Sequence, residues 1–294
     1  MMKKILIISV LVMGVGIPFS FCGNSHPMEG YDLTAPEKTY VLPDILHEIS
    51  GLTDISETEI ACVQDELGIV FIYDLEKSKV TEQIQFSEEG DYEGITMAGK
   101  DIYILRSDGQ LIEIKNFRSS DRQVNYHKTD IPAKDNEGLG FDSKNKRLLI
   151  GCKSKVGKGK EFANHRAVYG FDLKDKKMSK KPVLEIQLSD VIKFAKKNNV
   201  ELPTKTKKGV KKSALKLGIS AIAIHPKSGD TYLLSAVDHL IIVLDRKNEI
   251  KQLRMLDEKK FPQAEGLTFL PDGTMLISNE GANQKPTIFS FKQG

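Results

Sequence analysis

The sequence has no tryptophan, only three cysteines among its 294 residues, and a single long apolar run. So few cysteines exclude a small disulfide-rich domain, and one apolar run excludes a protein with several membrane-spanning helices. Neither sign of charge is in large excess, because 43 basic and 40 acidic residues leave a net charge of only +3. The composition, 40% hydrophobic and 28% charged, is that of a chain long enough to bury a sizeable core.

The apolar run follows Lys3 and Lys4 and extends from Ile5 to Phe21. It is shorter than the roughly 20 residues of a membrane span, and the lysines before it predict a signal peptide over residues 1–22. The segment that ends at Cys22 resembles a bacterial lipobox, which predicts lipidation of Cys22; ordinary cleavage after Cys22 is the alternative, since Phe21 stands where a small residue is expected. We therefore expect an exported envelope protein, periplasmic, lipid-anchored to the outer membrane or secreted, whose membrane contact is limited to that anchor.

A short motif recurs along the rest of the chain, consisting of a polar residue, a very small residue and an aliphatic residue. Its five copies are Ser50-Gly51-Leu52, Glu93-Gly94-Ile95, Glu137-Gly138-Leu139, Ser220-Ala221-Ile222 and Glu265-Gly266-Leu267. A turn, an apolar strand pattern and an alternating strand pattern follow each copy. Four short antiparallel strands repeated every 40 to 45 residues or so are typical of β-propeller blades. We therefore predict an all-β protein, a propeller of four-stranded antiparallel blades.

The number of blades depends on one long interval between the third and fourth motifs, which is nearly twice the others. Residues 189–218 account for the excess: they lack strand alternation, begin like a helix at Ser189 and contain nine lysines against Asp190 and Glu201. We read them as a helical, lysine-rich insertion between blades 3 and 4, which gives five blades; six shorter blades are the alternative.

The last repeat has three strand patterns, and an isolated one, Lys38–Leu42, precedes the first repeat. This N-terminal strand is expected to complete the last blade and so close the ring. The predicted organisation is a signal peptide, a tether over residues 23–37 and a single propeller domain over 38–294. Cys62 and Cys152 fall in similar strands of non-adjacent blades, so two buried free thiols are favoured over the disulfide that an oxidising compartment would permit.

The polar residue of each motif begins the innermost strand of a blade, so these residues should face one another at one mouth of the channel. They are Ser50, Glu93, Glu137, Ser220 and Glu265. Carboxylates this close repel one another unless they take up protons or bind a cation. Carboxylate and hydroxyl oxygens suit Ca²⁺, and suit Mg²⁺ less well, whereas the absence of His and Cys from the motif argues against Zn²⁺. The alternative is that each glutamate only accepts hydrogen bonds from backbone amides.

Basic residues are expected at the same mouth. Arg106 and Lys153 follow second strands, and the loop from Lys153 to Lys160 and the lysine-rich insertion should also reach it. Cations beside a metal predict an anionic small molecule or glycan as the ligand, such as a phosphate ester or a sugar acid; the alternative is a solvated, solubilising surface. Nucleic acid is not expected, because no aromatic residues are interleaved with the basic ones.

The ordered set of motifs, among them Asp91-Tyr92-Glu93-Gly94-Ile95 and Ala264-Glu265-Gly266-Leu267, resembles the SdiA-regulated family of bacterial β-propellers over residues 38–292. The resemblance implies a propeller in the cell envelope, similar in shape to phytase-like and lactonase-like propellers that hold Ca²⁺ in the channel. It implies no established activity, and the lysine-rich insertion is not a feature expected of the family.

The leading hypothesis is an exported, monomeric propeller that binds Ca²⁺ through Glu93, Glu137 and Glu265 and takes an anionic ligand. Two alternatives remain: a Ca²⁺-dependent hydrolase of a phosphate ester or lactone, and a protein-interaction scaffold. No complete arrangement of nucleophile and base is visible that would favour catalysis.

Overall fold

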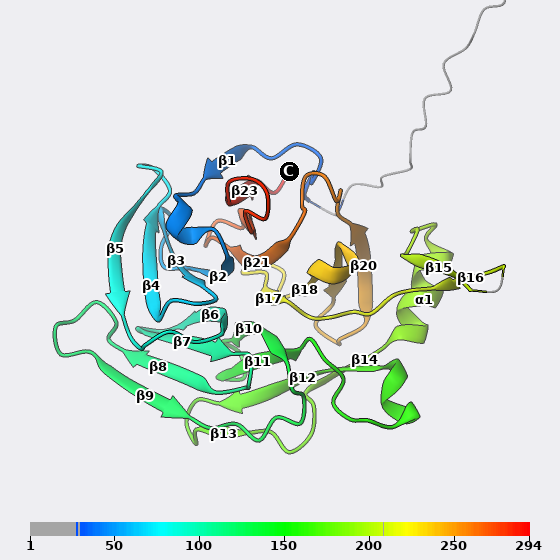
Figure 1. Cartoon of the computed structure of the whole chain (residues 1–294), viewed down its shortest axis with the longest axis horizontal. Helices are drawn as coiled ribbons and strands as arrows, with labels where there is room; N and C mark the ends of the chain where they lie inside the picture. The colour runs from blue at the N-terminus through cyan, green and yellow to red at the C-terminus, as the bar shows by residue number, and fades with distance from the viewer. Residues whose placement is uncertain (1–27, 29, 208) are drawn as a thin grey trace, which may run out of the picture.

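The computed structural model describes residues 28, 30–207 and 209–294, so the predicted signal peptide and Cys22 lie outside the described residues. Five antiparallel sheets surround a common axis (Figure 1). Their innermost strands gather at the centre, and each lies beside the innermost strands of the two neighbouring sheets. The protein is therefore a five-bladed β-propeller, as the sequence predicts, and the six-bladed alternative is wrong.

The first two blades are regular four-stranded meanders, numbered from the axis outward. Blade 1 consists of β2 (Ile49–Asp54), β3 (Glu59–Gln64), β4 (Ile69–Asp74) and β5 (Lys79–Gln85). Blade 2 consists of β6 (Tyr92–Ala98), β7 (Asp101–Arg106), β8 (Leu111–Lys115) and β9 (Gln123–His127).

Blade 3 has a divided outer edge, because two short strands both pair with its third strand. Its strands are β10 (Asn136–Asp142), β11 (Arg147–Cys152), β12 (His165–Asp172), β13 (Lys177–Met178) and β14 (Leu184–Gln187). Blade 4 is again regular, with β17 (Ala221–Ile224), β18 (Thr231–Ser235), β19 (Leu240–Leu244) and β20 (Ile250–Met255).

Blade 5 joins the two ends of the described chain. Its inner strands are β21 (Ala264–Phe269), β22 (Met275–Asn279) and β23 (Thr287–Phe291), and its outermost strand is β1 (Lys38–Val41). Because β1 pairs with β23 in antiparallel register, the ring is closed by backbone hydrogen bonds between segments at opposite ends of the sequence. The prediction that the isolated N-terminal strand completes the last blade is confirmed.

The core lies between the blades, since each sheet packs its faces against its neighbours. Five apolar clusters correspond to the five interfaces between blades, including the interface between blade 5 and blade 1 that closes the ring. Glycine after the polar residue allows the inner strands to approach closely: a Cβ added to Gly94 would lie 2.6 Å from the carbonyl oxygen of Glu137. Cys62 and Cys152 are buried free thiols, as predicted.

Residues 30–37, expected to belong to a tether, lie against the propeller instead. Tyr31 and Leu33 are buried together with Met28 in the cluster between blades 4 and 5. Their contacts include the turn after β21, at the end of the blade opposite the motif residues. The sequence between the apolar run and β1 gave no periodic pattern, so this packing could not be read from it.

The insertion between blades 3 and 4 begins with α1 (Leu188–Lys197), the one α-helix of the described residues. Buried Leu188, Val191 and Ala195 fix the helix on the core between these blades. A two-stranded hairpin follows, β15 (Thr204–Lys207) with β16 (Val210–Ser213), where the polar sequence predicts no strand.

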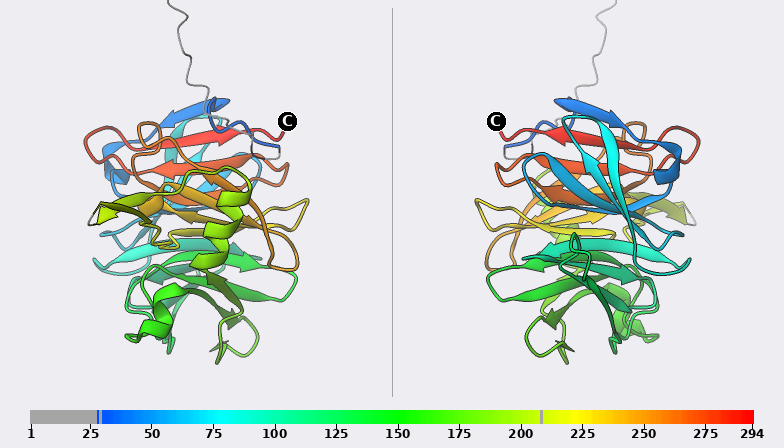
Figure 2. Two further views of the ribbon diagram at one scale, coloured as in Figure 1. Left: turned by 90° about the vertical axis from the view of Figure 1, so that its right-hand side faces the viewer. Right: turned by 90° about the vertical axis from the view of Figure 1, so that its left-hand side faces the viewer.

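Both parts of this insertion lie at the rim of the propeller, with α1 against the outermost strands β14 and β20 (Figure 1). Viewed from the side, α1 crosses the flank of the ring rather than either mouth (Figure 2). The helix and the hairpin of the lysine-rich insertion therefore do not cover the channel mouth. The reason is the apolar face of α1, which is buried against the outer strands and holds the lysines outside. The last residues of the insertion, in contrast, return to the mouth: a Cβ added to Gly218 would lie 3.1 Å from Cγ of Lys153.

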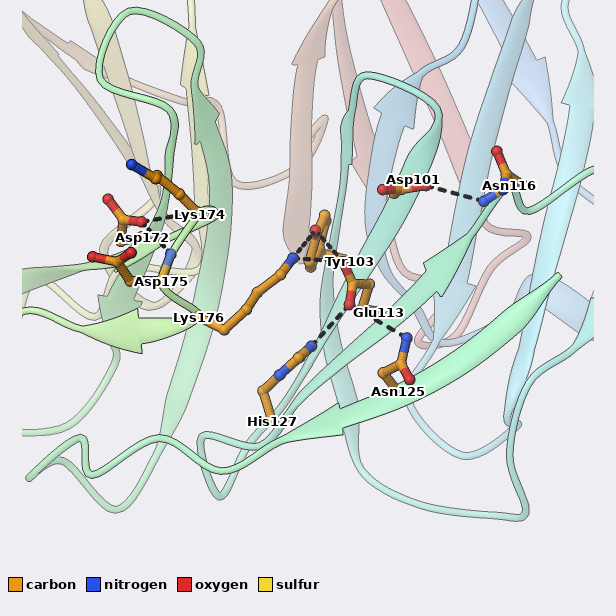
Figure 3. A network of polar contacts seen from close by, with 10 residues as sticks. All are labelled: Asp101, Tyr103, Glu113, Asn116, Asn125, His127, Asp172, Lys174, Asp175 and Lys176. Atoms are coloured by element: carbon orange, nitrogen blue, oxygen red, sulfur yellow. Dashed lines mark hydrogen bonds and ion pairs between the residues drawn. The ribbon is translucent and has the colours of Figure 1, made fainter.

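A buried polar network joins the outer halves of blades 2 and 3 (Figure 3). Glu113 of β8 is 1% exposed and accepts hydrogen bonds at 2.6 Å from the Tyr103 hydroxyl and from Lys176, which reaches across from the turn after β12. His127 lies 3.0 Å from the other carboxylate oxygen. Burial alone would raise the pKa of Glu113, but these hydrogen bonds lower it to about 2.

Candidate functional site

The five polar residues of the repeated motif meet on the propeller axis. They line one narrow space of about 10 Å³, together with the small and aliphatic residues that follow them, and are Ser50, Glu93, Glu137, Ser220 and Glu265. A space of this volume holds about one water molecule or ion. Glu137 is buried, whereas Glu93 and Glu265 are half-buried and reach toward the mouth.

A β-bulge at the motif residue orients the side chains of this ring in four of the five blades. In blade 2, Tyr92 pairs with Arg106 and Gly94 with Leu105, so Glu93 has no partner on β7 and forms a β-bulge. The same shift occurs at the motif residue of blades 1, 3 and 5. A bulge turns a side chain out of the ordinary alternation of a strand, and these bulges turn the motif residues toward the axis.

The two serines of the ring form hydrogen bonds with the backbone, and Ser220 also forms one with the side chain of Glu265. The Ser50 hydroxyl donates to the carbonyl of Glu48, and the Ser220 hydroxyl donates to the carbonyl of Leu234 at 3.3 Å. The carboxylates of the three glutamates form no hydrogen bonds of this kind: within the described part of the chain, no backbone N–H donates to Glu93, Glu137 or Glu265. Backbone hydrogen bonding, the simpler explanation offered for three acids at this position, therefore does not account for them.

A second layer of acids surrounds the ring. Asp91 and Asp135 each stand two residues before a motif glutamate, and Asp65 and Glu280 follow the second strands of blades 1 and 5. Carboxylate oxygens of Glu93, Asp135 and Glu137 lie within 4.8 Å of one another, close enough to share one metal ion. Asp91 and Asp135 were missed in the sequence, although the spacing Asp-x-Glu occurs at both places and would have revealed them.

Lys153 is a cation beside this acidic cluster, and its side chain is 41% exposed. It follows β11 directly, and its Nζ forms an ion pair with Oε1 of Glu137. Glu137 Oε2 is buried and has no hydrogen-bond partner among the described residues. Lys153 was predicted to bind an anion; in the structure one of its contacts is the carboxylate of Glu137, and its side chain remains partly exposed.

Arg106 is the last residue of β7, and it pairs with Tyr92, the residue before Glu93. Its guanidinium donates to the side chains of Gln110 at 3.1 Å and Asp108 at 3.0 Å. These contacts lie at the end of β7 and in the turn that follows it, and the buried Nε of Arg106 has no hydrogen-bond partner among the described residues.

The carboxyl groups of the mouth hold protons more tightly than ordinary carboxyl groups. Burial, then the charges of Glu137 and Asp91, raise the pKa of Glu93 to about 9. Burial and the neighbouring acids raise the pKa of Glu265 to about 8 and that of Glu280 to about 7. For Glu137, burial outweighs the ion pair with Lys153, and the pKa rises to about 7. The cluster is thus partly protonated near neutral pH, and a bound cation would replace those protons.

The comparison with known families points in the same direction as the repeated motif. The model of the family described as SdiA-regulated matches residues 176–289, which extend from the outer part of blade 3 to β23. The resemblance to the SdiA-regulated family is confirmed. Of the five motif copies, this match contains those at Ser220 and Glu265. No curated protein sequence matches the chain.

Solved structures share the fold at low sequence identity. Glutaminyl cyclase from Myxococcus xanthus is similar with a TM-score of 0.57 and 13% identity, over 88% of this chain and 95% of that one. The PQQ-bound form of aldose sugar dehydrogenase from Streptomyces coelicolor is similar with a TM-score of 0.52 and 9% identity, over 88% and 97% of the two chains. Identities this low support a common propeller architecture and nothing more specific.

Among the described residues, no helix is both long and apolar enough to span a membrane.

Proposed function

We propose that the channel mouth binds a divalent cation, with Ca²⁺ the preferred ion and Mg²⁺ the weaker one. The donors are all oxygens, and the carboxylates of Glu93, Asp135 and Glu137 form the closest group. Ca²⁺ accepts six to eight such ligands in flexible geometry, whereas Mg²⁺ requires a stricter octahedron. The sequence predicts Glu93, Glu137 and Glu265 as the ligands. The proposed set adds Asp135 to Glu93 and Glu137, and Glu265 lines the same mouth without belonging to this closest group.

The observation that carries this proposal is the state of Glu137. Its side chain is buried, Oε1 contacts Lys153, and Oε2 has no partner among the described residues. An unsatisfied buried carboxylate oxygen costs about 1–3 kcal/mol, and more when it is charged. A cation bound by Oε2 would remove this cost and would also relieve the repulsion between Glu137 and Glu93.

Calcium titration tests the proposal. Ca²⁺ should raise the melting temperature of protein that has been treated with EDTA, with a larger effect than Mg²⁺ at the same concentration. Glu137→Gln and Asp135→Asn should each weaken Ca²⁺ binding at least about tenfold, as measured by calorimetry, while Glu82→Gln, an exposed acid on β5, should not. If the melting temperature is the same in EDTA and in millimolar Ca²⁺, the site does not bind the ion.

Export is part of the proposal and rests on the sequence alone. Two lysines, an apolar run and Cys22 at its end support a lipoprotein signal peptide. Mass spectrometry of the mature N-terminus and fractionation of the expressing bacterium test it: a diacylated Cys22 in the envelope fraction is expected. An intact N-terminal Met in the cytoplasmic fraction would contradict it.

A hydrolase is the second candidate, favoured by the half-buried Glu93. Because burial and the neighbouring acids raise its pKa to about 9, this carboxyl carries a proton near neutral pH when no cation is bound, and in that state it has the protonation of a general acid. Hydrolysis of phosphate esters and of lactones in the presence of Ca²⁺, with Glu93→Gln as the inactive comparison, distinguishes a catalyst from a binding protein.

A further inference from the structure

The β15–β16 hairpin is a separate feature of the molecule, and none of its described residues lines the acidic mouth. The two strands pair only with each other, and all eight of their residues are exposed. The hairpin projects from the rim of the propeller, beyond α1 (Figure 1). A two-stranded sheet of this kind, without an apolar face on a core, is at most marginally stable in water. Packing within the protein therefore does not explain why the hairpin is present.

The arrangement of lysines makes the hairpin less stable still. Lys205 stands directly opposite Lys212, and Lys207 lies on the same face two residues further along β15. Lys211 lies on the other face, opposite Thr206. Like charges at directly opposed positions destabilise a pair of strands. An anionic group between Lys205 and Lys212 would turn this repulsion into attraction.

The side chains of the hairpin restrict the kind of anion. Residues 204–213 contain no aromatic residue on which a base could stack, which disfavours single-stranded nucleic acid. Val210, 55% exposed, is the one apolar side chain of the two strands, so the apolar anchors of a protein interface are missing. Lysines occur on both faces, and a flat membrane would contact only one of them. Hydroxyl groups of Thr204, Thr206 and Ser213 accompany Lys211 and can bond to sugar hydroxyls.

We propose that the β15–β16 hairpin binds the chain of an anionic polysaccharide, with carboxylate or sulfate groups of the polymer between its lysines. This site is independent of the cation site, because none of its residues belongs to the channel mouth.

The test uses the mature chain and two polymers, polygalacturonate as a polycarboxylate and heparin as a polysulfate, with neutral dextran for comparison. The wild-type protein should bind at least one of the charged polymers at 150 mM salt or so, and should not bind dextran. The triple variant Lys205→Gln, Lys207→Gln and Lys212→Gln should lose affinity by about tenfold or more, because it removes the three charges of one face that would pair with the polymer.

A matched control removes the same charge elsewhere. Lys177, Lys180 and Lys181 are exposed at the outer edge of blade 3, and their triple change to Gln should leave the affinity within about twofold. Replacement of residues 204–213 by a short Gly-Ser linker should abolish the difference between charged polymers and dextran without lowering the melting temperature of the propeller. This deletion keeps the test valid even if the lysine variant alters the hairpin.

Three results would overturn the proposal. Equal losses in the two triple variants would mean that affinity follows net charge alone. Failure of the wild-type protein to bind either charged polymer would exclude the polysaccharide. Tighter, hairpin-dependent binding to vesicles that contain phosphatidylglycerol than to either polymer would assign the hairpin to a membrane surface instead. None of these results bears on Ca²⁺ binding at the mouth.

Discussion

The hydroxyl of Tyr31 lies 2.8 Å from Nε2 of His225 and donates a hydrogen bond to the carbonyl of Gly273 at 2.5 Å. Nδ1 of His225 accepts hydrogen bonds from the backbone N–H groups of Lys227 and Ser228. Because Nδ1 is an acceptor, the proton of the neutral ring is on Nε2 and is donated to Tyr31. This pair of side chains holds the segment before β1 on blades 4 and 5.

Tyr31→Phe tests how much this attachment stabilises the fold. The change leaves the Gly273 carbonyl and the His225 Nε2–H without their partner, so the free energy of unfolding should fall by about 1–3 kcal/mol. Urea denaturation measures it. Tyr126→Phe is the control, because Tyr126 is 53% exposed and its hydroxyl makes only long contacts of 3.4 Å. Equal effects of the two changes would mean that the Tyr31 hydroxyl has no special role.

Glu93→Gln should stabilise the protein in the absence of Ca²⁺, more at pH 8 than at pH 5. Glu93 has a pKa near 4.5 in the unfolded chain and about 9 in the folded protein. Between these values the folded protein binds more protons, so its stability falls as the pH rises, and Gln removes this loss. We expect a gain of at least about 1 kcal/mol at pH 8 in chemical denaturation. A gain that does not change with pH would contradict the raised pKa.

Lys153→Met should lower the stability of the calcium-free protein and raise its affinity for Ca²⁺. Without Ca²⁺ the buried carboxylate of Glu137 loses its cation, and the free energy of unfolding should fall by about 1–3 kcal/mol. With Ca²⁺ the affinity should rise several-fold, because no internal ammonium competes for the acids. Calorimetric titration measures the affinity, and Lys155→Met, exposed in the same loop, is the control. Weaker Ca²⁺ binding in Lys153→Met would place the ion elsewhere.

Glu113→Gln tests the network between blades 2 and 3. The buried carboxylate is bonded to Lys176, so its replacement should lower the free energy of unfolding by about 3–5 kcal/mol at pH 7. The pKa of Glu113 is lowered from 4.5 to about 2, so its contribution is complete above pH 4.5 or so and is lost as the pH falls toward 2. The difference between wild type and variant should therefore shrink below pH 4. Glu76→Gln, exposed in the turn after β4, should show no such difference.

The architecture could be predicted from the sequence because blades are built from neighbouring strands. Each copy of the polar-small-aliphatic motif marks an innermost strand, and its recurrence reveals the period without any knowledge of long-range contacts. The ring of motif residues follows from the same period, since equivalent positions of a propeller face a common axis. Closure of the ring by β1 could also be predicted, because one strand pattern in the sequence belonged to no repeat and the last repeat had only three strand patterns.

The partners of individual side chains depended on the tertiary structure. The sequence places Lys153 at the same mouth as the acids, and the Asp-x-Glu spacing places Asp135 near Glu137, but neither pattern indicates that Lys153 pairs with Glu137 or that Asp135 lies within 4.8 Å of Glu93 and Glu137. The lysine-rich insertion lies at the rim because α1 buries Val191 and Ala195 against the outer strands, a choice made by packing. Repetition in the sequence thus determined the blades and the ring of acids, and only the folded chain decided which charges meet, because pairing across blades requires the distances that folding creates.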